Sequence, residues 1–295
     1  MDDKLLFVQF PHPGKEHEPD DGLVKGWNKR PHPHRRKFLK QAGKYLAGGK
    51  VVEGEMLFWG EWEPESKVER KINASICRGP RFVYTPYYVV PKSYDGLENT
   101  DPFVFGEQFH YTVCKQRTFA QLRRLSPGSV ILFGSCESHA FVLDTVFVVG
   151  SQWIDHAKSL YRSVLKGKIS QEYEEVTILP WYQEPCAETK SCNSAESEGP
   201  WRLYFGATYD KPFHGMYSFF PCQPYDARSE GFARPEINLP DQIKPKQNTG
   251  VKYSVQSSLD EMKLLWGKVA DQVKDQGLVL GIHADMPERR LADVS

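Results

Sequence analysis

The sequence predicts an α+β fold in which a mixed β-barrel carries helical and loop elaborations, and three observations support this. Residues 130–135 and 141–149 are dominated by β-branched and aromatic residues, as is typical of buried strands. Near the C-terminus, apolar residues recur at helical spacing behind Ser258 and Glu261, which form a capping box. The chain has 295 residues and no internal repeat, so we expect one elaborated domain over residues 1–295.

The predicted elements follow in order along the chain. Alternating or continuous apolar residues predict the strands, and apolar residues three or four apart predict the helices. We expect strands at 5–10, 57–64, 81–90, 130–135, 141–149, 201–208, 214–220 and 278–282, and helices at 34–46, 118–125, 155–165 and 258–276. Residues 105–180 form the barrel-like segment, and residues 184–200, rich in Ser, Glu, Cys and Pro, are expected to be a disordered loop.

Composition argues against several classes of protein. Lys and Arg together number 38, as do Asp and Glu, which argues against non-specific coating of nucleic acid, because such binding requires many phosphate contacts. The chain contains no run of 18 apolar residues, so we expect no membrane span. Its six cysteines form no Cys-x-x-Cys pair and no disulfide framework, which predicts reduced thiols and a cytoplasmic location.

A local excess of positive charge predicts an anion site near the N-terminus. Nine Lys or Arg residues and no Asp or Glu occur in residues 25–50. On the helix predicted there, Arg36, Lys40 and Lys44 lie four residues apart and would form one ridge. Arg35, Arg36 and Lys40 are therefore the predicted phosphate contacts, and the alternative is an ordinary solvated helix face.

Two side chains near these cations can move a proton. His12, in the turn that follows the first strand, and Glu61 are the candidate catalytic residues, since burial and neighbours can tune either pKa toward neutral pH. The alternative for His12 is a polar surface turn shaped by prolines. We predict no metal site and no cofactor, because His12 and His17 would need a third ligand such as His34 or Glu61.

Aromatic and amide side chains complete the predicted ligand site. Trp59 and Trp62 offer flat rings on which a base or sugar can stack, and the alternative is packing in the core. Gln108 can make two-point contacts to a base edge, or can face solvent on an ordinary strand. The predicted ligand-binding residues are Gln9, His17, Arg35, Arg36, Lys40, Trp59, Trp62 and Gln108.

Two stretches resemble known families. The order Leu122-x-x-Leu125, Pro127-Gly128 and two apolar strands over 130–149 resembles PUA-like domains of the EVE and ASCH kind, which hold one base in an aromatic-walled pocket. The motifs Val-Gln-Phe-Pro-His-Pro-Gly-Lys-Glu-His over 8–17 and Gly-Glu-Trp-Glu-Pro over 60–64 look like those of bacterial and phage nucleotide-modification-associated domains. These resemblances imply a prokaryotic or phage protein that accompanies DNA modification or phage defence.

The sequence thus predicts a protein that recognises a nucleotide, or a modified base in nucleic acid. The first alternative is an enzyme that acts on a nucleoside glycosidic bond or a phosphoester, with Glu61 or His12 as general acid or base. The second alternative is a partner-binding protein whose aromatic residues in 213–220 form an interface.

Overall fold

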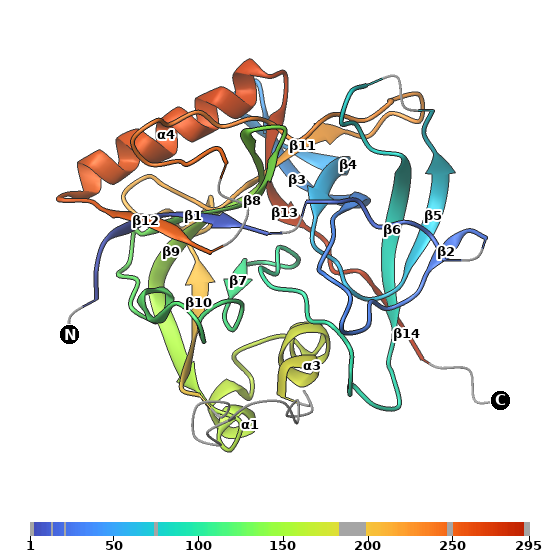
Figure 1. Ribbon diagram of the computed structural model, residues 1–295, viewed down its shortest axis with the longest axis horizontal. Helices are drawn as coiled ribbons and strands as arrows, with labels where there is room; N and C mark the ends of the chain where they lie inside the picture. The colour runs from blue at the N-terminus through green and yellow to red at the C-terminus, as the bar shows by residue number, and fades with distance from the viewer. Residues whose placement is uncertain are drawn as a thin grey trace.

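Residues 3–12, 14–20, 22–73, 76–182, 199–246 and 250–291 are described by the structure, a computed structural model of the chain. They form an α+β fold that consists mainly of β-sheet, with few helices (Figure 1). The strands are β1 (Leu6–Pro11), β2 (Val24–Lys25), β3 (Lys37–Ala47), β4 (Lys50–Gly60), β5 (Ser66–Lys71), β6 (Phe82–Val89), β7 (His110–Tyr111), β8 (Val130–Glu137), β9 (Ala140–His156), β10 (Trp201–Gly206), β11 (Phe220–Pro224), β12 (Lys252–Val255), β13 (Val279–Ala284) and β14 (Glu288–Arg290). The helical segments are η1 (Ala120–Arg123), α1 (Tyr161–Leu165), α2 (Gln171–Tyr173), η2 (Glu174–Ile178), α3 (Leu179–Tyr182) and α4 (Leu259–Asp275).

One sheet has six strands in the order β12-β1-β8-β9-β10-β7. β1 pairs in parallel with β8, with Phe10 opposite Phe133, and β8 and β9 form an antiparallel hairpin. Side chains alternate along β1, since Leu6, Val8 and Phe10 join one apolar cluster whereas Phe7 joins another. Both faces of this sheet are therefore buried, which explains the nearly continuous apolar sequence of β8 and β9.

The other sheet has eight strands, in the order β13-β11-β4-β3-β6-β5-β2 with β14 beside β6. β3 and β4 form a long hairpin that turns at Gly48-Gly49, both at positive φ (56° and 76°), a backbone conformation that favours glycine. β13 pairs with β3 as well as with β11, so β3, β4, β11 and β13 form a closed circuit of paired strands. The hairpin register places Lys37, the first residue of β3, opposite Gly60, the last residue of β4.

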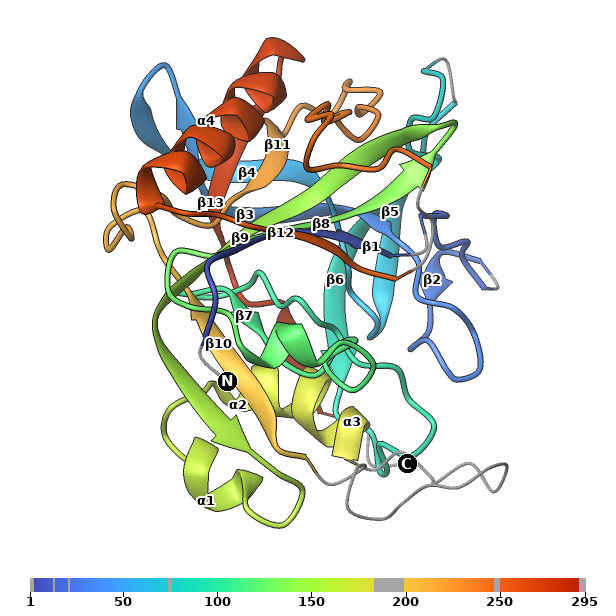
Figure 2. The same cartoon turned by 60° about the vertical axis from the view of Figure 1, so that its left-hand side comes forward.

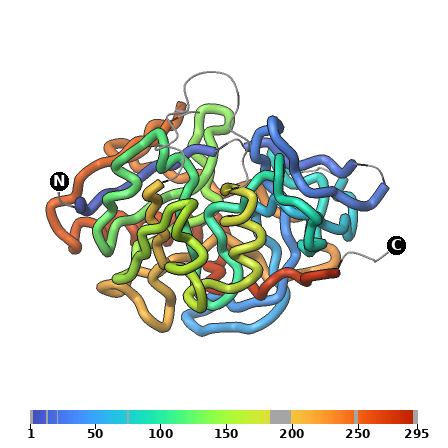
Figure 3. Tube along the Cα trace, turned by 90° about the horizontal axis from the view of Figure 1, so that it is seen from below, coloured from blue at the N-terminus to red at the C-terminus, as the bar shows by residue number. Residues whose placement is uncertain are grey.

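The C-terminal helix α4 covers the six-stranded sheet (Figure 1). Its buried residues Met262, Leu265 and Val269 belong to the same apolar cluster as Phe7 of β1. The Ser258 hydroxyl accepts a hydrogen bond from the Glu261 backbone N–H, so the predicted cap and helix are confirmed. The short helices α1, α2 and α3 lie at the opposite end of the molecule (Figure 2), and α4 and β2 lie on opposite sides when the protein is seen from below (Figure 3).

The helix predicted over residues 34–46 is wrong, because this segment is strand β3. Its apolar residues fit a helical spacing, but hydrogen bonds to β4 along its whole length and to β13 at its end hold it extended. Gly48-Gly49, which would stop a helix, instead makes the two-residue turn of a hairpin.

Three further predictions need correction or remain outside the described residues. The helix predicted over 155–165 is limited to residues 161–165, because β9 continues to His156. The strand predicted over 214–220 begins only at Phe220. The loop predicted over 184–200 lies, except for its last two residues, outside the described residues. In the part of the chain that the structure describes, no helix is long and apolar enough to cross a membrane.

Candidate functional site

His12 lies in the loop directly after β1, and this loop is held against β8. The backbone N–H of His12 donates to the Gly134 carbonyl at 2.7 Å. Gly14 lies so close to β8 that a Cβ there would be 2.7 Å from the Ser135 Cβ, so no larger residue fits without a shift. The His12 ring is consequently fixed in the interior, with only 3% of the residue exposed.

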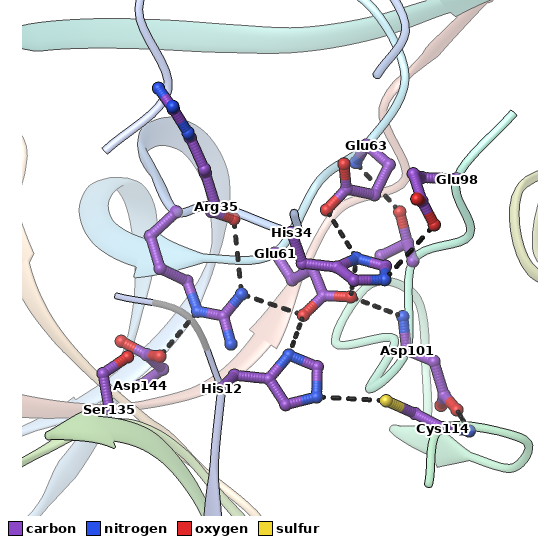
Figure 4. A network of polar contacts seen from close by, with 12 residues as sticks. His12, His34, Arg35, Glu61, Glu63, Glu98, Asp101, Cys114, Ser135 and Asp144 are labelled. Carbon is purple, nitrogen blue, oxygen red and sulfur yellow. Dashed lines mark hydrogen bonds and ion pairs between the residues drawn. The ribbon is translucent and has the colours of Figure 1, made fainter. Parts of the chain in front are cut away.

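Charged residues next to the start of β3, next to the end of β4 and within β9 meet His12. Because β3 begins where β4 ends, Arg36 and Glu61 are brought together, and Asp144 of β9 faces them (Figure 4). Arg36 Nη1 donates to Glu61 Oε2 at 2.9 Å, and Arg36 Nε donates to Asp144 Oδ2 at 2.6 Å. His12 Nδ1 lies 3.1 Å from the same Glu61 oxygen.

A thiol lies on the other side of the His12 ring. His12 Nε2 is 3.0 Å from Cys114 Sγ, so Glu61, His12 and Cys114 form a continuous chain of polar contacts (Figure 4). Asp101 holds the backbone of Cys114 in place, since its side-chain oxygen accepts a hydrogen bond from the Cys114 backbone N–H at 2.7 Å. The backbone N–H of Asp101 in turn donates to Glu61 Oε1 at 3.2 Å.

A second group of acidic and imidazole side chains adjoins the first. His34 Nδ1 lies 3.0 Å from Glu63 Oε1 and 3.4 Å from Glu61 Oε1, and His34 Nε2 lies 3.3 Å from Glu98 Oε2 (Figure 4). On its other side, Glu63 Oε2 faces His17 Nε2 at 3.7 Å. His34, Glu61 and Glu63 each offer one ligand atom within 4.8 Å of the others, so these three residues could hold a metal ion.

Burial and charge set the protonation of these groups in different ways. Burial lowers the pKa of His12 to about 4 despite the nearby Glu61, so its ring is neutral at pH 7. Burial alone would raise the pKa of Glu61, but the adjacent His12, Arg36 and His34 hold it well below its usual range. Burial also opposes the charge on His34, yet Glu63 and Glu61 raise its pKa well above the usual value. Burial raises the pKa of the Cys114 thiol, so the thiol is protonated at neutral pH.

A cavity of about 970 Å³ opens beside His12, and we call it the cationic cavity. It is lined by His12, Gly14, Lys15, Glu16, Glu18, Pro33, Arg35, Trp59, Ile76, Arg78, Gly79, Arg81, Cys136, Glu137, Ser138 and Arg234. Its three carboxylates are each paired with one of its arginines: Glu16 and Glu18 with Arg81, and Glu137 with Arg234. Arg78 pairs outside this set, with Glu236 at 2.7 Å.

Two cations of the cationic cavity remain without a partner among the described residues. Neither Lys15 nor Arg35 makes an ion pair or a side-chain hydrogen bond within the described part of the chain. In Figure 4 the guanidinium of Arg35 extends away from the buried network, and only its backbone carbonyl accepts a bond from Arg36. The cationic cavity therefore has positive charge available for an anionic ligand.

The predicted stacking role of Trp59 and Trp62 does not fit the structure. Trp62 is fully buried between Tyr88 and Phe105, and its indole N–H donates to the Glu65 carbonyl at 2.9 Å. Trp59 borders the cationic cavity but is 5% exposed, and its N–H donates to the Phe232 carbonyl. Both rings pack in the core, as the alternative interpretation stated.

The predicted cationic ridge is also corrected, because Lys40 and Lys44 lie on strand β3 and Arg36 immediately precedes it. Arg36 is buried and occupied by two carboxylates, so it is not available to a phosphate. Lys40 pairs with Glu55 at 2.9 Å, and neither it nor Lys44 lines the cationic cavity. Of the three predicted phosphate contacts, Arg35 alone lies at that cavity.

The other predicted ligand-binding residues are dispersed. Gln9 is fully buried, and its side-chain amide donates to the Lys244 carbonyl and accepts from the Lys244 backbone N–H, so its role is structural. Gln108 donates to the Gly206 carbonyl and borders a different cavity. The prediction that it lies in the N-terminal site is therefore wrong. His17 lies in the interior beside Glu63, next to His34.

Of the aromatic residues in the interface predicted over 213–220, Phe213 and Tyr217 are partly exposed, whereas Phe219 and Phe220 are not at the surface. Phe219 and Phe220 are fully buried, and Met216 is buried with them. Phe219 packs near Trp266 of α4, with ring centroids 6.1 Å apart, and Phe220 packs on Phe58 of β4. These two rings therefore belong to the core, and a partner surface in this segment, which stays a prediction, could use only Phe213 and Tyr217.

Several residues of the site were not found from the sequence. Cys114, Asp101 and Asp144 are scattered along the chain, and no spacing links them to His12 or Glu61. Glu63 lies in the Gly-Glu-Trp-Glu-Pro motif over 60–64 and Lys15 lies in the turn after the first strand, but neither was predicted to contact a ligand.

A comparison of the chain with protein-family models, with curated proteins and with solved structures finds no match. The fold and the site therefore define an α+β protein with a buried charge network beside a cationic cavity.

Proposed function

We propose that this protein binds a phosphate-bearing ligand in the cationic cavity, namely a nucleotide or a nucleotide unit of nucleic acid. The single observation that carries the proposal is that two cations, Lys15 and Arg35, have no partner among the described residues at a cavity whose carboxylates are already paired. Arginine recognises phosphate through two parallel hydrogen bonds, and lysine supplies a point charge. Such a local anion site agrees with a chain of zero net charge.

The choice of a nucleotide among phosphate-bearing ligands rests on resemblance. Residues 8–17 and 60–64 resemble nucleotide-modification-associated domains, and these stretches contain His12, Lys15 and Glu61. Residues 105–149 resemble PUA-like domains. β1, which contains the start of the 8–17 motif, pairs in parallel with β8 of the β8–β9 hairpin, so this motif adjoins the PUA-like stretch. A PUA-like fold, a cytoplasmic location and a role in DNA modification or phage defence are parts of this proposal.

The test compares Arg35 with Lys40, which were both predicted to contact phosphate but of which only Arg35 lines the cationic cavity. We expect Arg35→Gln to weaken binding of ATP, or of a short single-stranded DNA, about 10-fold to 100-fold, since a charge-assisted hydrogen bond is lost. Lys40→Gln is the matched control, because Lys40 lies outside the cavity and pairs with Glu55. Isothermal titration calorimetry of the wild type and both variants, with inorganic phosphate as a third probe, gives the affinities.

The three probes separate the ligand classes. Binding of ATP but not of phosphate supports recognition of the nucleoside, and preference for the oligonucleotide supports a nucleic-acid ligand. Equal affinities for Arg35→Gln and Lys40→Gln would contradict the cationic cavity as the binding site. No binding of any probe by the wild type would contradict the proposal itself.

A catalytic version of this function is favoured by the position of His12. The ring borders the cationic cavity, is neutral at pH 7 and contacts both Glu61 and Cys114. A neutral imidazole oriented by a carboxylate can accept a proton from a nucleophile and return it to a leaving group. The candidate reactions are hydrolysis of a nucleoside glycosidic bond or of a phosphoester.

A turnover measurement distinguishes binding from catalysis. Nucleotides and oligonucleotides are incubated with the protein, and the products are analysed by mass spectrometry. If the protein is an enzyme, His12→Ala should abolish product formation and retain ligand binding. Recovery of unchanged ligand from the wild type would leave binding as the function and contradict the catalytic version.

A further inference from the structure

The strongest feature that the proposed function leaves unused is the group of imidazoles and carboxylates beside the charge network. Glu63 is fully buried, yet in the described part of the chain its ion-pair contacts are to the imidazoles of His17 and His34, and none is to Lys or Arg. An ionised carboxylate in the interior normally requires a cation or a metal ion, and the imidazole of His34 can serve Glu63 either as a protonated partner or, once deprotonated, as a second ligand of the same metal ion. Glu61, also buried, approaches the same His34 nitrogen from the other side.

We propose that His34, Glu61 and Glu63 bind one divalent transition-metal ion through His34 Nδ1, Glu61 Oε1 and Glu63 Oε1. His34 Nδ1 lies 3.0 Å from Glu63 Oε1 and 3.4 Å from Glu61 Oε1, and all three atoms lie within 4.8 Å of one another. When each ligand atom lies about 2.0 to 2.2 Å from one ion, the ligand atoms are separated from one another by distances similar to those observed between these three atoms. The geometry therefore leaves room for an ion without a rearrangement of the backbone.

The surroundings of each ligand match those of known metal sites. A histidine ligand usually donates its second ring N–H to a carboxylate, and His34 Nε2 lies 3.3 Å from Glu98 Oε2. Glu61 is oriented by Arg36 Nη1, which donates to its other oxygen at 2.9 Å. The backbone of Glu63 is held in place by the Thr100 hydroxyl, which accepts from the Glu63 N–H at 3.1 Å.

An independent observation comes from His17. His17 is 2% exposed, and its Nε2 makes no hydrogen bond among the described residues, nor does Glu63 Oε2, which faces it at 3.7 Å. Buried polar atoms without a hydrogen bond are uncommon in native proteins. An ion on Glu63 would draw this carboxylate into a fixed position, with His17 either orienting its second oxygen or serving as a fourth ligand.

The ligand set selects the class of metal. One imidazole nitrogen and two carboxylate oxygens suit Zn²⁺, Mn²⁺ or Fe²⁺, whereas Mg²⁺ and Ca²⁺ prefer oxygen alone. No thiol is among the three ligands, since Cys114 contacts His12 and not His34. His34 is the most exposed of the three side chains, at 23%, and provides the route by which an ion enters.

The experiment measures metal binding in the absence of any nucleotide, so its result is independent of the proposed function. Protein purified without a histidine tag and stripped with EDTA is titrated with Zn²⁺ and, separately, with Mn²⁺ by calorimetry. We expect one ion per chain for the wild type and an affinity at least about 100-fold lower for Glu63→Gln, which keeps the shape of the side chain. Glu55→Gln is the matched control, because Glu55 pairs with the surface residue Lys40.

Two outcomes would overturn the proposal. One is a wild type that binds neither ion, and the other is a Glu63→Gln variant that is folded by circular dichroism and binds as tightly as Glu55→Gln. If Glu63→Gln does not fold, the Co²⁺ absorption spectrum of the wild type decides. Ligand-field bands without a thiolate charge-transfer band support the site of nitrogen and oxygen ligands, whereas a strong thiolate band places the ion at a cysteine and overturns the proposal.

Discussion

Lys37, the first residue of β3, and Arg36, which immediately precedes it, are buried, whereas farther along the strand Lys40 and Lys44 lie at the surface or near it. Arg36 connects Glu61 with Asp144, and Lys37 Nζ donates to the Pro64 carbonyl and the Ser66 hydroxyl. Lys40 and Lys44 instead pair with Glu55 and Glu53 across the hairpin. The comparison teaches that clustered positive charge in a sequence does not locate a site. Burial, and the partners that burial enforces, separate the functional region from an ordinary solvated one.

The largest difference between the two halves of β3 should appear in stability. We expect Arg36→Met to reduce the free energy of unfolding by about 3 to 5 kcal/mol, because Glu61 and Asp144 would remain buried without their shared cation. Lys44→Met is the control and should change it by less than about 0.5 kcal/mol, since its pair with Glu53 is exposed. Urea denaturation of both variants measures the difference, and similar losses would contradict the comparison.

The same comparison applies to two histidines, one with carboxylate partners and one without. Acid should destabilise the protein through the buried histidine that has no carboxylate partner to stabilise its charged form. Burial lowers the pKa of His110 to about 4, and its ring stacks on Tyr173. The unfolded chain takes up a proton near pH 6.5 while the folded protein stays neutral, so the stability is full above that pH and is lost as the pH falls toward 4. The loss amounts to about 3 kcal/mol from this residue. His34 behaves oppositely, since its pKa is raised by Glu63 and Glu61.

A matched variant isolates the contribution of His110. His110→Phe should fit among Phe103, Phe205 and Tyr173, and its unfolding free energy should fall less steeply between pH 6.5 and 4.5 than that of the wild type. Urea denaturation at several pH values gives both curves. Parallel curves would show that His110 is not the group responsible.

The smallest expected effect concerns Lys40. Its ammonium lies 2.9 Å from Glu55 Oε1 and 4.2 Å from the centre of the Tyr225 ring, both near the surface. We expect Lys40→Gln to reduce the free energy of unfolding by no more than about 1 kcal/mol, and less in high salt, because solvent and ions screen such pairs. A loss comparable with that of Arg36→Met would show that the outer half of β3 is as strongly coupled as the inner half.

The sequence predicted much of the fold where local pattern and tertiary environment agree. β1, β6, β8, β9, β10 and β13 lie where continuous or alternating apolar residues predict them, and α4 begins at its predicted cap. The prediction for residues 34–46 was wrong, because the apolar residues of β3 fit a helical spacing although the segment is a strand. Only the pairing of β3 with β4 and β13, which joins residues far apart in the chain, distinguishes strand from helix.

By itself, the sequence determined that the segment containing His12, Lys15, Arg35 and Glu61 holds the richest chemistry of the chain, because residue type and local spacing are properties of the sequence. Only the tertiary structure decided which of these groups meet. It buried Trp62 and Arg36, placed Lys15 and Arg35 at a cavity without a partner in the described part of the chain, and brought Cys114, Asp144 and Glu98 to the same place. The physical reason is that burial, pKa and partnership depend on contacts between distant segments, and no local pattern encodes those contacts.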